Sequence, residues 1–328
     1  MPGLGHRSYI QFGLKESTYG TFQTPNTKLE IISWNVAPQI GVIQDPSLYS
    51  AQSRRGLYQG GLMYRGTFVV RVNYDGLEEL MRGVFGTYSQ TPVGVGRDHK
   101  FSEGPTLNSY TFEVSVGDIP STQVFRLLGA KITGMTIRGT SGVGTDAMLQ
   151  AEFTVVAKDM TSGQTPTGAL SYPAVLPVLY HQCTTADDGT ADASSSIRIR
   201  SFEVTLEQPH AEDRFYLGSV NIDEPLRADF LTARWRLTQE FTTLTQFNAA
   251  KAFTVGSPKL IFEHPTDLGA GFKRQFELRS EKANLVEFTN PIEGYGVLVS
   301  TATWEAWYDT TDASALYCRI KNNLAALA

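Results

Sequence analysis

The chain contains 328 residues, of which 41% are hydrophobic and 19% are charged, so it is long enough for two domains and too apolar for wholesale disorder. Its formal net charge of −5 argues against a general basic surface that would bind nucleic acid. The charge is uneven, because residues 1–168 carry 14 basic and 13 acidic side chains whereas residues 169–328 carry 14 and 20.

Strand signals dominate the chain. Runs of apolar, β-branched and aromatic residues, often alternating with polar ones, are typical of strands that bury one face. No window approaches the ~18 consecutive apolar residues of a membrane-spanning helix, and the first residues lack the apolar core of a secretory signal. We therefore expect a mainly β protein without a membrane partner. The predicted strands are Leu29–Val36, Tyr110–Val116, Ala130–Ile137, Ala147–Ala157, Ile197–Leu206, Arg234–Phe241, Lys259–Phe262, Gln275–Leu278, Ala283–Phe288, Val297–Tyr308 and Leu316–Ile320.

Two helices are predicted, one in each half of the chain. In the first, Asp75 and Glu78 have the spacing of a capping box, and Gly86 can end the helix. In the second, Thr243 and Gln246 form a similar pair. Each helix should cover one face of a sheet with its apolar side. The apolar positions are Leu77, Leu80, Met81 and Val84 in the first helix, and Phe247 and Ala250 in the second.

An internal repeat and a linker-like run organise the chain. The strand-then-helix pattern of Gly66–Gly86 recurs in Ala233–Phe253, at a constant offset of 167 residues. At this offset Phe68 matches Trp235, and most patterned positions match in kind. Between the two copies, Thr161–Gly168 is rich in Gly, Ser, Thr and Pro, as linkers are. We therefore predict two duplicated domains, residues 1–168 and 169–328.

Two long segments, Gly41–Arg65 and Gln208–Asp229, show no regular pattern and are predicted to be loops. Loops longer than roughly 12–15 residues in compact domains are usually functional or mobile. Both contain aromatic side chains that burial against a neighbouring chain would cover. The arginines of the first loop are expected either to be solvated or to pair with acidic residues of the second loop across a subunit interface. Such exposed ion pairs would fix the relative position of the subunits more than they would strengthen their binding. The candidate contact residues are Arg54, Arg55, Leu57, Tyr58, Tyr64, Glu212, Asp213, Phe215, Tyr216, Asp223 and Glu224.

No cluster of side chains indicates catalysis, a metal or a cofactor. The five histidines are scattered, and His181 with Cys183 provides too few ligands for zinc. The glycine-rich stretches lack the Gly-Lys-Ser/Thr ending of a phosphate-binding loop. Cys183 and Cys318 are interpreted as ordinary thiols in a reducing compartment. We therefore predict no enzyme activity, no metal site and no cofactor.

Several segments, taken in order, resemble the phage tail tube protein family, in the version where two tube-type domains are fused. The resemblance covers nearly the whole chain. The second helix departs from the family pattern, because Thr242-Thr243 replaces Asp-Gly. The segments that carry the resemblance are Glu16–Thr21 (ESTYGT), Arg54–Gly56, Gly66–Gly86, Leu128–Ile132, Ala147–Asp159, Ile199–Phe202 and Asp213–Ser219.

This resemblance implies a mainly β fold of two tandem, duplicated tail-tube-type β-sandwich or barrel domains, each with one short α-helix. Because family rings usually contain six domains, a fused pair implies a homotrimer with pseudo-hexameric symmetry. Such rings stack into a helical tube in the virion tail, assembled in the host cytoplasm. The implied partners are further copies of the chain, a tape measure protein inside the tube, tail terminator and distal tail proteins at its ends, and phage DNA that passes through without specific binding.

Two other functions remain open from the residues alone. A distal tail or baseplate hub protein shares the tube fold but ends the stack. A β-sandwich carbohydrate-binding module would present aromatic platforms, for which the four tryptophans are candidates. Trp235 and Trp304 share faces with alternating apolar residues and are predicted to lie in the core, which leaves Trp34 and Trp307.

Overall fold

The computed structural model describes residues 8–47, 53, 56–116, 124–144, 147–168, 172–174, 176–190, 198–290 and 296–327. Within these ranges the chain is mainly β and contains two α-helices, one in each half, in agreement with the predicted fold class. The helices are α1 (Glu78–Phe85) and α2 (Thr245–Ala252), and a 3₁₀ turn covers Tyr180–Gln182.

Ten strands precede residue 168 and nine follow it among the described residues. The first group is β1 (Tyr9–Phe12), β2 (Thr27–Leu29), β3 (Ile31–Gln44), β4 (Leu57–Arg71), β5 (Gly86–Val93), β6 (Gly96–Glu103), β7 (Ser109–Ser115), β8 (Val124–Thr140), β9 (Gln150–Ala157) and β10 (Asp159–Gln164). The second group is β11 (Cys183–Asp187), β12 (Ile199–Glu207), β13 (Thr232–Glu240), β14 (Val255–Gly256), β15 (Lys259–Asp267), β16 (Lys273–Arg279), β17 (Ala283–Thr289), β18 (Val299–Ala306) and β19 (Tyr317–Asn322).

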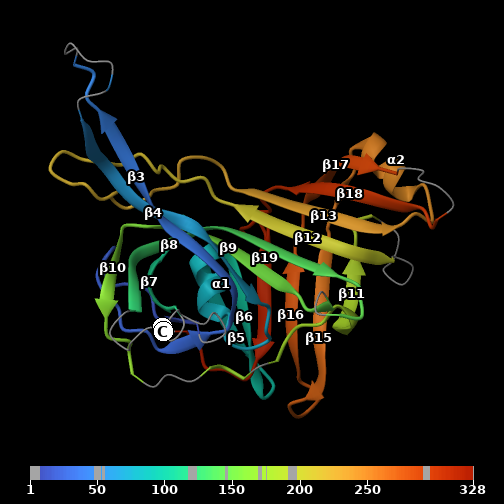
Figure 1. Ribbon diagram of the computed structural model, residues 1–328. Helices are drawn as coiled ribbons and strands as arrows, with labels where there is room; N and C mark the ends of the chain where they lie inside the picture. The colour runs from blue at the N-terminus through green and yellow to red at the C-terminus, as the bar shows by residue number, and fades with distance from the viewer. Residues whose placement is uncertain are drawn as a thin grey trace.

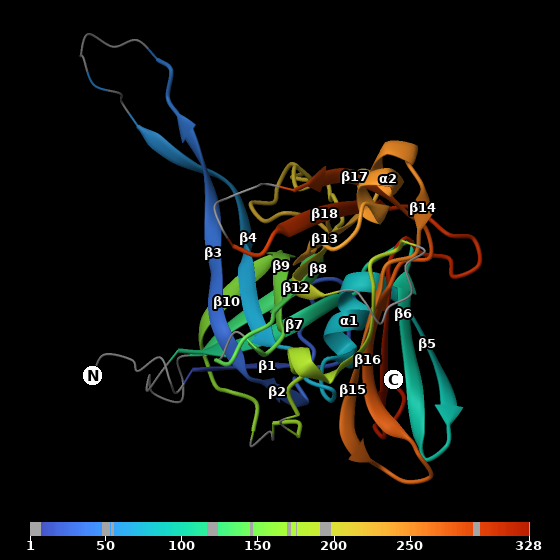
Figure 2. The ribbon, with the colours of Figure 1, turned by 90° about the vertical axis from the view of Figure 1, so that its right-hand side faces the viewer.

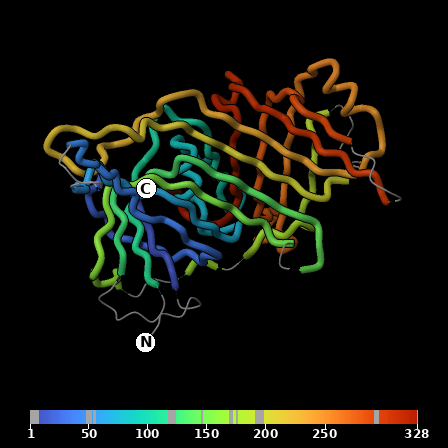
Figure 3. The backbone as a smooth tube through the Cα atoms, turned by 45° about the horizontal axis from the view of Figure 1, so that its top comes forward, coloured from blue at the N-terminus to red at the C-terminus, as the bar shows by residue number. Residues whose placement is uncertain are grey.

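The larger of two sheets crosses the middle of the chain without a break (Figures 1 and 3). It contains a run of antiparallel strands in the order β3-β4-β9-β8-β12-β13-β18-β17. Strand β8 is long enough to serve both halves, because its first part pairs with β7 and β10 and its second part pairs with β9 and β12. We call this run of eight strands the large sheet.

The smaller sheet has the order β11-β15-β16-β19-β6-β5, so it also combines strands from both halves. The β19–β6 pairing therefore joins the halves a second time. The predicted linker is wrong for Thr161–Gln164, which belong to β10, because their backbone groups pair with β8. The boundary at residue 168 stays a prediction, since both sheets extend across it.

The helices agree with the offset of the sequence repeat. Both α1 and α2 have eight residues, and their first residues, Glu78 and Thr245, are 167 positions apart. Each helix follows an antiparallel strand pair, β3–β4 in the first half and β12–β13 in the second. This arrangement is what a duplication would produce, and the duplication itself stays a prediction.

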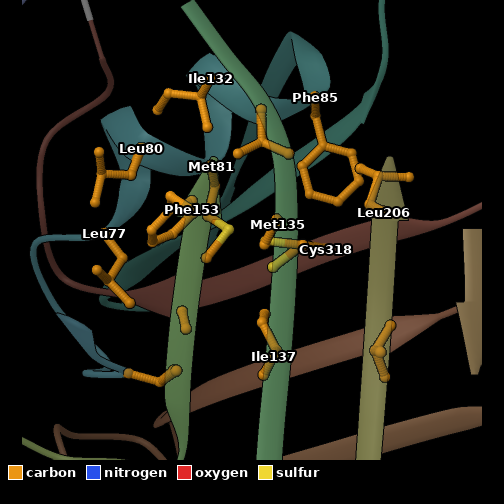
Figure 4. Close-up of a cluster of buried hydrophobic side chains, with 14 of the residues drawn as sticks. Leu77, Leu80, Met81, Phe85, Ile132, Met135, Ile137, Phe153, Leu206 and Cys318 are labelled. Carbon is orange, nitrogen blue, oxygen red and sulfur yellow. The ribbon is translucent and has the colours of Figure 1, made fainter. Parts of the chain in front are cut away.

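Helix α1 lies between the two sheets and its apolar side is fully covered (Figure 4). Leu80 and Met81 lie near Ile132 of β8 and Phe153 of β9, which form the inner side of the large sheet. Gly86 ends the helix with a φ of 88°, as predicted. The predicted capping box is wrong: Leu77 is the N-cap residue and no side chain caps the helix.

Asp75 does not cap α1 because it is engaged across the two halves. Its carboxylate forms an ion pair with Arg274 of β16, with Oδ2 3.1 Å from Nε. Glu78 accepts a hydrogen bond from the Gly76 N–H at 2.9 Å and another from the Asn322 side chain of β19. Both carboxyl groups are almost fully buried. The start of α1 is therefore a polar joint between the first and second halves.

Helix α2 is much less covered than predicted. Leu244 is its N-cap residue, no side-chain hydrogen bond caps it, and Gln246 is its only buried residue. The Gln246 amide donates a hydrogen bond to the buried carboxylate of Asp188. Asp188 also accepts hydrogen bonds from the backbone and hydroxyl of Thr190. A polar anchor, rather than an apolar face, thus holds α2 to the sandwich.

The predicted first loop, Gly41–Arg65, is wrong, because most of it belongs to a long β-hairpin. Strands β3 and β4 pair from Ile31–Val70 out to Gln44–Leu57, and the hairpin projects well beyond the body of the molecule (Figures 1 and 2). Its outer part has no buried face, so its sequence lacks the alternation that identifies a half-buried strand. The second predicted loop, Gln208–Asp229, contains only isolated bridges and no named strand.

Candidate functional surfaces

The outer hairpin, residues 39–44 and 57–63, carries apolar side chains that nothing in the described chain covers. Most are exposed over more than half of their surface: Ile40, Val42, Ile43, Leu57 and Tyr58. Tyr64, further down β4, is buried within the chain instead. Arg54 and Arg55 lie outside the described residues. Exposed apolar patches of this kind mark contact surfaces in soluble proteins.

The two segments predicted as loops lie against each other within one chain. The N–H of Leu62 in β4 donates to the carbonyl of Val220 at 2.8 Å, and the N–H of Ile222 donates to the carbonyl of Leu62 at 3.1 Å. Gly61 allows this approach, because a Cβ there would lie 2.7 Å from the ring of Phe215. The segment 208–229 therefore braces the base of the outer hairpin, and both project from the same end of the molecule (Figure 1).

Three of the four acidic candidates in this segment have partners within the chain. Glu212 pairs with Arg65 at 2.8 Å, Asp223 with Arg214 at 3.6 Å, and Glu224 with Lys131 at 2.8 Å. Asp213 is exposed. Of the aromatic candidates, Phe215 and Tyr216 keep more than a third of their surface exposed.

Lys131 is the residue of this region that sequence analysis missed. It lies in β8, its side chain is only 3% exposed, and its ammonium group also donates to the Pro225 carbonyl at 3.0 Å. Its position within the apolar Ala130–Ile137 run could have identified it, because a lysine buried in a strand needs partners for its ammonium group. Lys131 fastens the segment 208–229 to the large sheet at a point away from the hairpin.

A second surface is the outer face of the large sheet, opposite the core. Side chains on this face form polar rows across the strands, because antiparallel partners point to the same side. One row is Ser33, Val69, Glu152, Thr136, Thr205, Arg234 and Glu305. The next is Arg71, Gln150, Arg138, Glu203, Arg236, Thr303 and Glu287.

Charges of both signs are interspersed on this outer face. Arg138 pairs with Glu152 at 2.7 Å, and Arg200 pairs with Glu240 at 2.8 Å. Arg198 adds a second, longer contact to Glu240, and the resulting hydrogen bonds lower the pKa of that carboxyl below its usual value. The arginines are thus largely neutralised by neighbouring carboxylates, and the face as a whole has no dominant sign.

A third surface is formed by the two free edges of the large sheet. In the described part of the chain, β3 pairs only with β4. At the opposite edge, β14 pairs with the first two residues of β17, and residues 286–289 pair only with β18. An edge strand with unpaired backbone groups is a template for pairing with another chain.

The sequence matches the phage tail tube protein family over residues 5–306. The chain belongs to this family. The match spans both halves, as the fused two-domain resemblance implies, and it identifies a structural component of the phage tail. A comparison with curated proteins finds no match.

The described part of the chain gives little support for a metal site, a membrane-spanning helix, a reactive thiol or a carbohydrate platform. No group of three metal-ligating side chains comes together there, and no helix has the length and hydropathy to span a membrane. Burial raises the pKa of the Cys183 thiol to about 11, which keeps it protonated and unreactive at neutral pH. Trp235 and Trp304 are fully buried, as predicted, and cannot serve as carbohydrate platforms.

Proposed function

We propose that this chain is the subunit of a tail tube, in which three copies close into a pseudo-hexameric ring and rings stack around a channel that conducts phage DNA. The observation that carries the proposal is the large sheet, which spans both halves and ends in two free edges. Within the chain, β12 of the second half adds to the edge of β8 in the first half. The same kind of addition between chains would join β3 of one copy to β17 of the next.

Strand correspondence sets the register of this contact. Trp34 pairs with Phe68, and Val204 pairs with Trp235, so β3 occupies in the first half the place of β12 in the second. Each half contributes four antiparallel strands to the large sheet, β3-β4-β9-β8 and β12-β13-β18-β17. Three copies would therefore provide six equivalent units, and a heterologous contact between successive units returns on itself to close a ring.

One pair of residues follows from this correspondence. Thr205 of β12 pairs with Thr136 of β8, with the hydroxyl oxygens 3.4 Å apart. Asn35 of β3 corresponds to Thr205 of β12, and Glu287 of β17 corresponds to Thr136 of β8. In each case the side chain lies on the outer face of the sheet, next to the matching pair of core residues. Asn35 of one copy would thus pair with Glu287 of the next.

The outer face of the large sheet would line the channel. A lumen rich in unpaired lysine or arginine would bind phosphates and stall the passage of DNA, because counterion release makes such binding strong. The interspersed and mutually paired charges of this face leave no such basic surface. Several of the uncharged positions on this face are threonines, including Thr136, Thr205, Thr238 and Thr301.

Stacking would use the outer hairpin and the segment 208–229. Both project from one end of the molecule (Figure 1), and their exposed apolar side chains, Leu57, Tyr58 and Tyr216, would be covered by the next ring. An inter-subunit ion pair of Arg54 or Arg55 with an acidic residue of 208–229 remains part of this proposal. Asp213 suits it best, since Glu212, Asp223 and Glu224 have partners in their own chain.

The other partners follow from this assembly. The tape measure protein would occupy the channel before DNA does, and terminator and distal tail proteins would cap the ends of the stack. The protein would act in the virion tail after assembly in the host cytoplasm, without enzymatic activity, metal or cofactor. A hub protein that ends the stack would instead form rings that do not extend into tubes.

Disulfide cross-linking tests the ring contact. The double variant Asn35→Cys, Glu287→Cys should give covalent dimers and closed trimers on oxidation, and no larger species on non-reducing gels. The single variants and the pair Asn35→Cys, Glu152→Cys serve as controls, because Glu152 lies on the same face but inside the sheet. Negative-stain images should contain hollow tubes. A wild type that stays monomeric at all concentrations, or cross-links that stop at another stoichiometry, would contradict the proposal.

A further inference from the structure

Helix α2 and its surroundings expose an apolar patch that the matching helix α1 does not. We define the α2 patch as Leu244, Phe247, Phe253, Val255 and Val286. Leu244 is 61% exposed and Phe247 is 48% exposed. The residues 167 positions earlier, Leu77 and Leu80, are 2% and 1% exposed. The same positions of the two helices are thus covered in one half and open in the other.

The covering of α1 has two sources that α2 lacks. After α1 the chain forms the β5–β6 hairpin, which extends the small sheet next to the helix. In addition β19, a strand of the other half, pairs with β6 and contacts the helix region through Asn322. After α2 the chain makes only the two-residue strand β14 and enters β15 at Lys259. The hairpin that follows, β15–β16, lies in the small sheet between β11 and β19 and does not cover α2, whose main packing partner among the described residues is β17.

The place of α2 in the sheet is nevertheless equivalent to that of α1. Helix α1 packs on the inner side of the large sheet against β8, the strand that pairs with β12 of the other half. Figure 4 shows Leu206 of β12 beside Phe85 of α1. Helix α2 lies against β17, with the rings of Phe247 and Phe288 6.5 Å apart. Residues 286–289 of β17, which pair with β18 on one edge only, lie next to α2.

We propose that the α2 patch is a docking surface for the first half of a second copy of this chain, as the second half docks on α1 within the chain. The inference rests on the proposed ring and deepens it. Strand β3 of the second copy, added to β17, would bring Ile32 and Trp34 to the side of the sheet where α2 lies. Ile32 is 54% exposed and Trp34 half-buried in the single chain. Apolar surface would then meet apolar surface on both copies.

In this arrangement α1 forms an interface within the chain and α2 forms an interface between chains. The first half carries its own hairpin and completes its interface inside the chain. In the second half the β15–β16 hairpin lies elsewhere in the small sheet and leaves α2 open, so the free subunit exposes a patch that only the next subunit covers. Ring closure then depends on the α2 patch, whereas the Asp188 anchor holds α2 in place within the subunit.

The variant Phe247→Asp tests this proposal, and Val95→Asp is the matched control. Val95 is 55% exposed at the tip of the β5–β6 hairpin, away from α2. Sedimentation velocity over a concentration series should show that Phe247→Asp needs roughly tenfold to hundredfold more protein than wild type to form rings. Val95→Asp should assemble as wild type does. Rings of Phe247→Asp at the wild-type concentration would overturn the proposal.

Hydrogen exchange of the wild type provides a second readout that needs no folded variant. Amides of residues 245–253 should exchange at least about tenfold more slowly in rings than in monomers. Rings in which these amides exchange at the monomer rate would overturn the α2 assignment and leave the tube proposal intact. A wild type that forms no rings under any condition would overturn both.

Discussion

Glu78 is expected to make the stability of the subunit fall as the pH rises. Its carboxyl is buried at the joint between α1 and β19, and burial raises its pKa from the usual 4.5 to about 7. Hydrogen bonds from the Gly76 N–H and the Asn322 amide oppose this effect without cancelling it. Arg274 of this joint pairs with Asp75.

The sign and size follow from proton linkage. Between pH 4.5 and about 7 the folded state holds a proton on Glu78 that the unfolded state has lost, so the folded form loses stability across this window. The two pKa values correspond to at most about 3 kcal/mol at neutral and alkaline pH. Glu78→Gln keeps the shape and an accepting oxygen while removing the ionisation. This variant should therefore be more stable than wild type at pH 8 by about 1–3 kcal/mol, and nearly equal to it at pH 4.5.

Urea unfolding of the monomer at several pH values, below the concentration at which it assembles, measures this difference. Burial also lowers the pKa values of His99 and His210, and both histidines are present in wild type and variant, so the comparison is made between the two proteins at each pH. Glu305→Gln, on the exposed outer face, is the control and should not reproduce the pH-dependent gain. A Glu78→Gln variant whose stability runs parallel to wild type from pH 4.5 to 8 would refute the reasoning.

Three further substitutions probe other parts of the molecule. Asp188→Ala leaves the Gln246 amide without its acceptor. This variant should lower the unfolding free energy by about 1–3 kcal/mol and speed amide hydrogen exchange in α2. Unchanged exchange in α2 would show that the anchor is not needed. Lys131→Met removes the tie to segment 208–229, whose amides should exchange about tenfold faster by mass spectrometry while the midpoint of unfolding changes little. Gly66→Ala places a Cβ 1.8 Å from a carbonyl oxygen of β3 and should lower the free energy of unfolding by about 3 kcal/mol or more. The control Gly134→Ala, whose Cβ meets nothing closer than 3.5 Å, should melt at nearly the wild-type temperature in the same thermal scan.

Patterns that depend on neighbouring residues in the chain were predictable. The helix ending at Gly86 was correct because its apolar spacing and its glycine are local features. The core positions of Trp235 and Trp304 were correct because alternation identifies a strand with one buried face. The outer hairpin was missed, since a strand with both faces exposed lacks alternation and resembles a loop. The acidic residues of 208–229 were considered as partners of Arg54 and Arg55 across a subunit interface, which stays a prediction, and sequence alone did not indicate that Lys131 and Arg65 pair with Glu224 and Glu212 within the chain.

The sequence by itself determined that the chain is mainly β and that it resembles a tail tube protein, and it predicted that the second half repeats the strand-and-helix order of the first. These properties lie in short-range periodicity and in the order of motifs, which a single chain displays in full. Only the tertiary structure decided that β8 and β12 merge the halves into one sheet, and that α1 is enclosed while α2 is open. Both outcomes depend on pairing between strands distant in the chain and on where the hairpin after each helix packs, because β5–β6 lies against α1 whereas β15–β16 does not cover α2. No local pattern encodes these placements or which edges remain free.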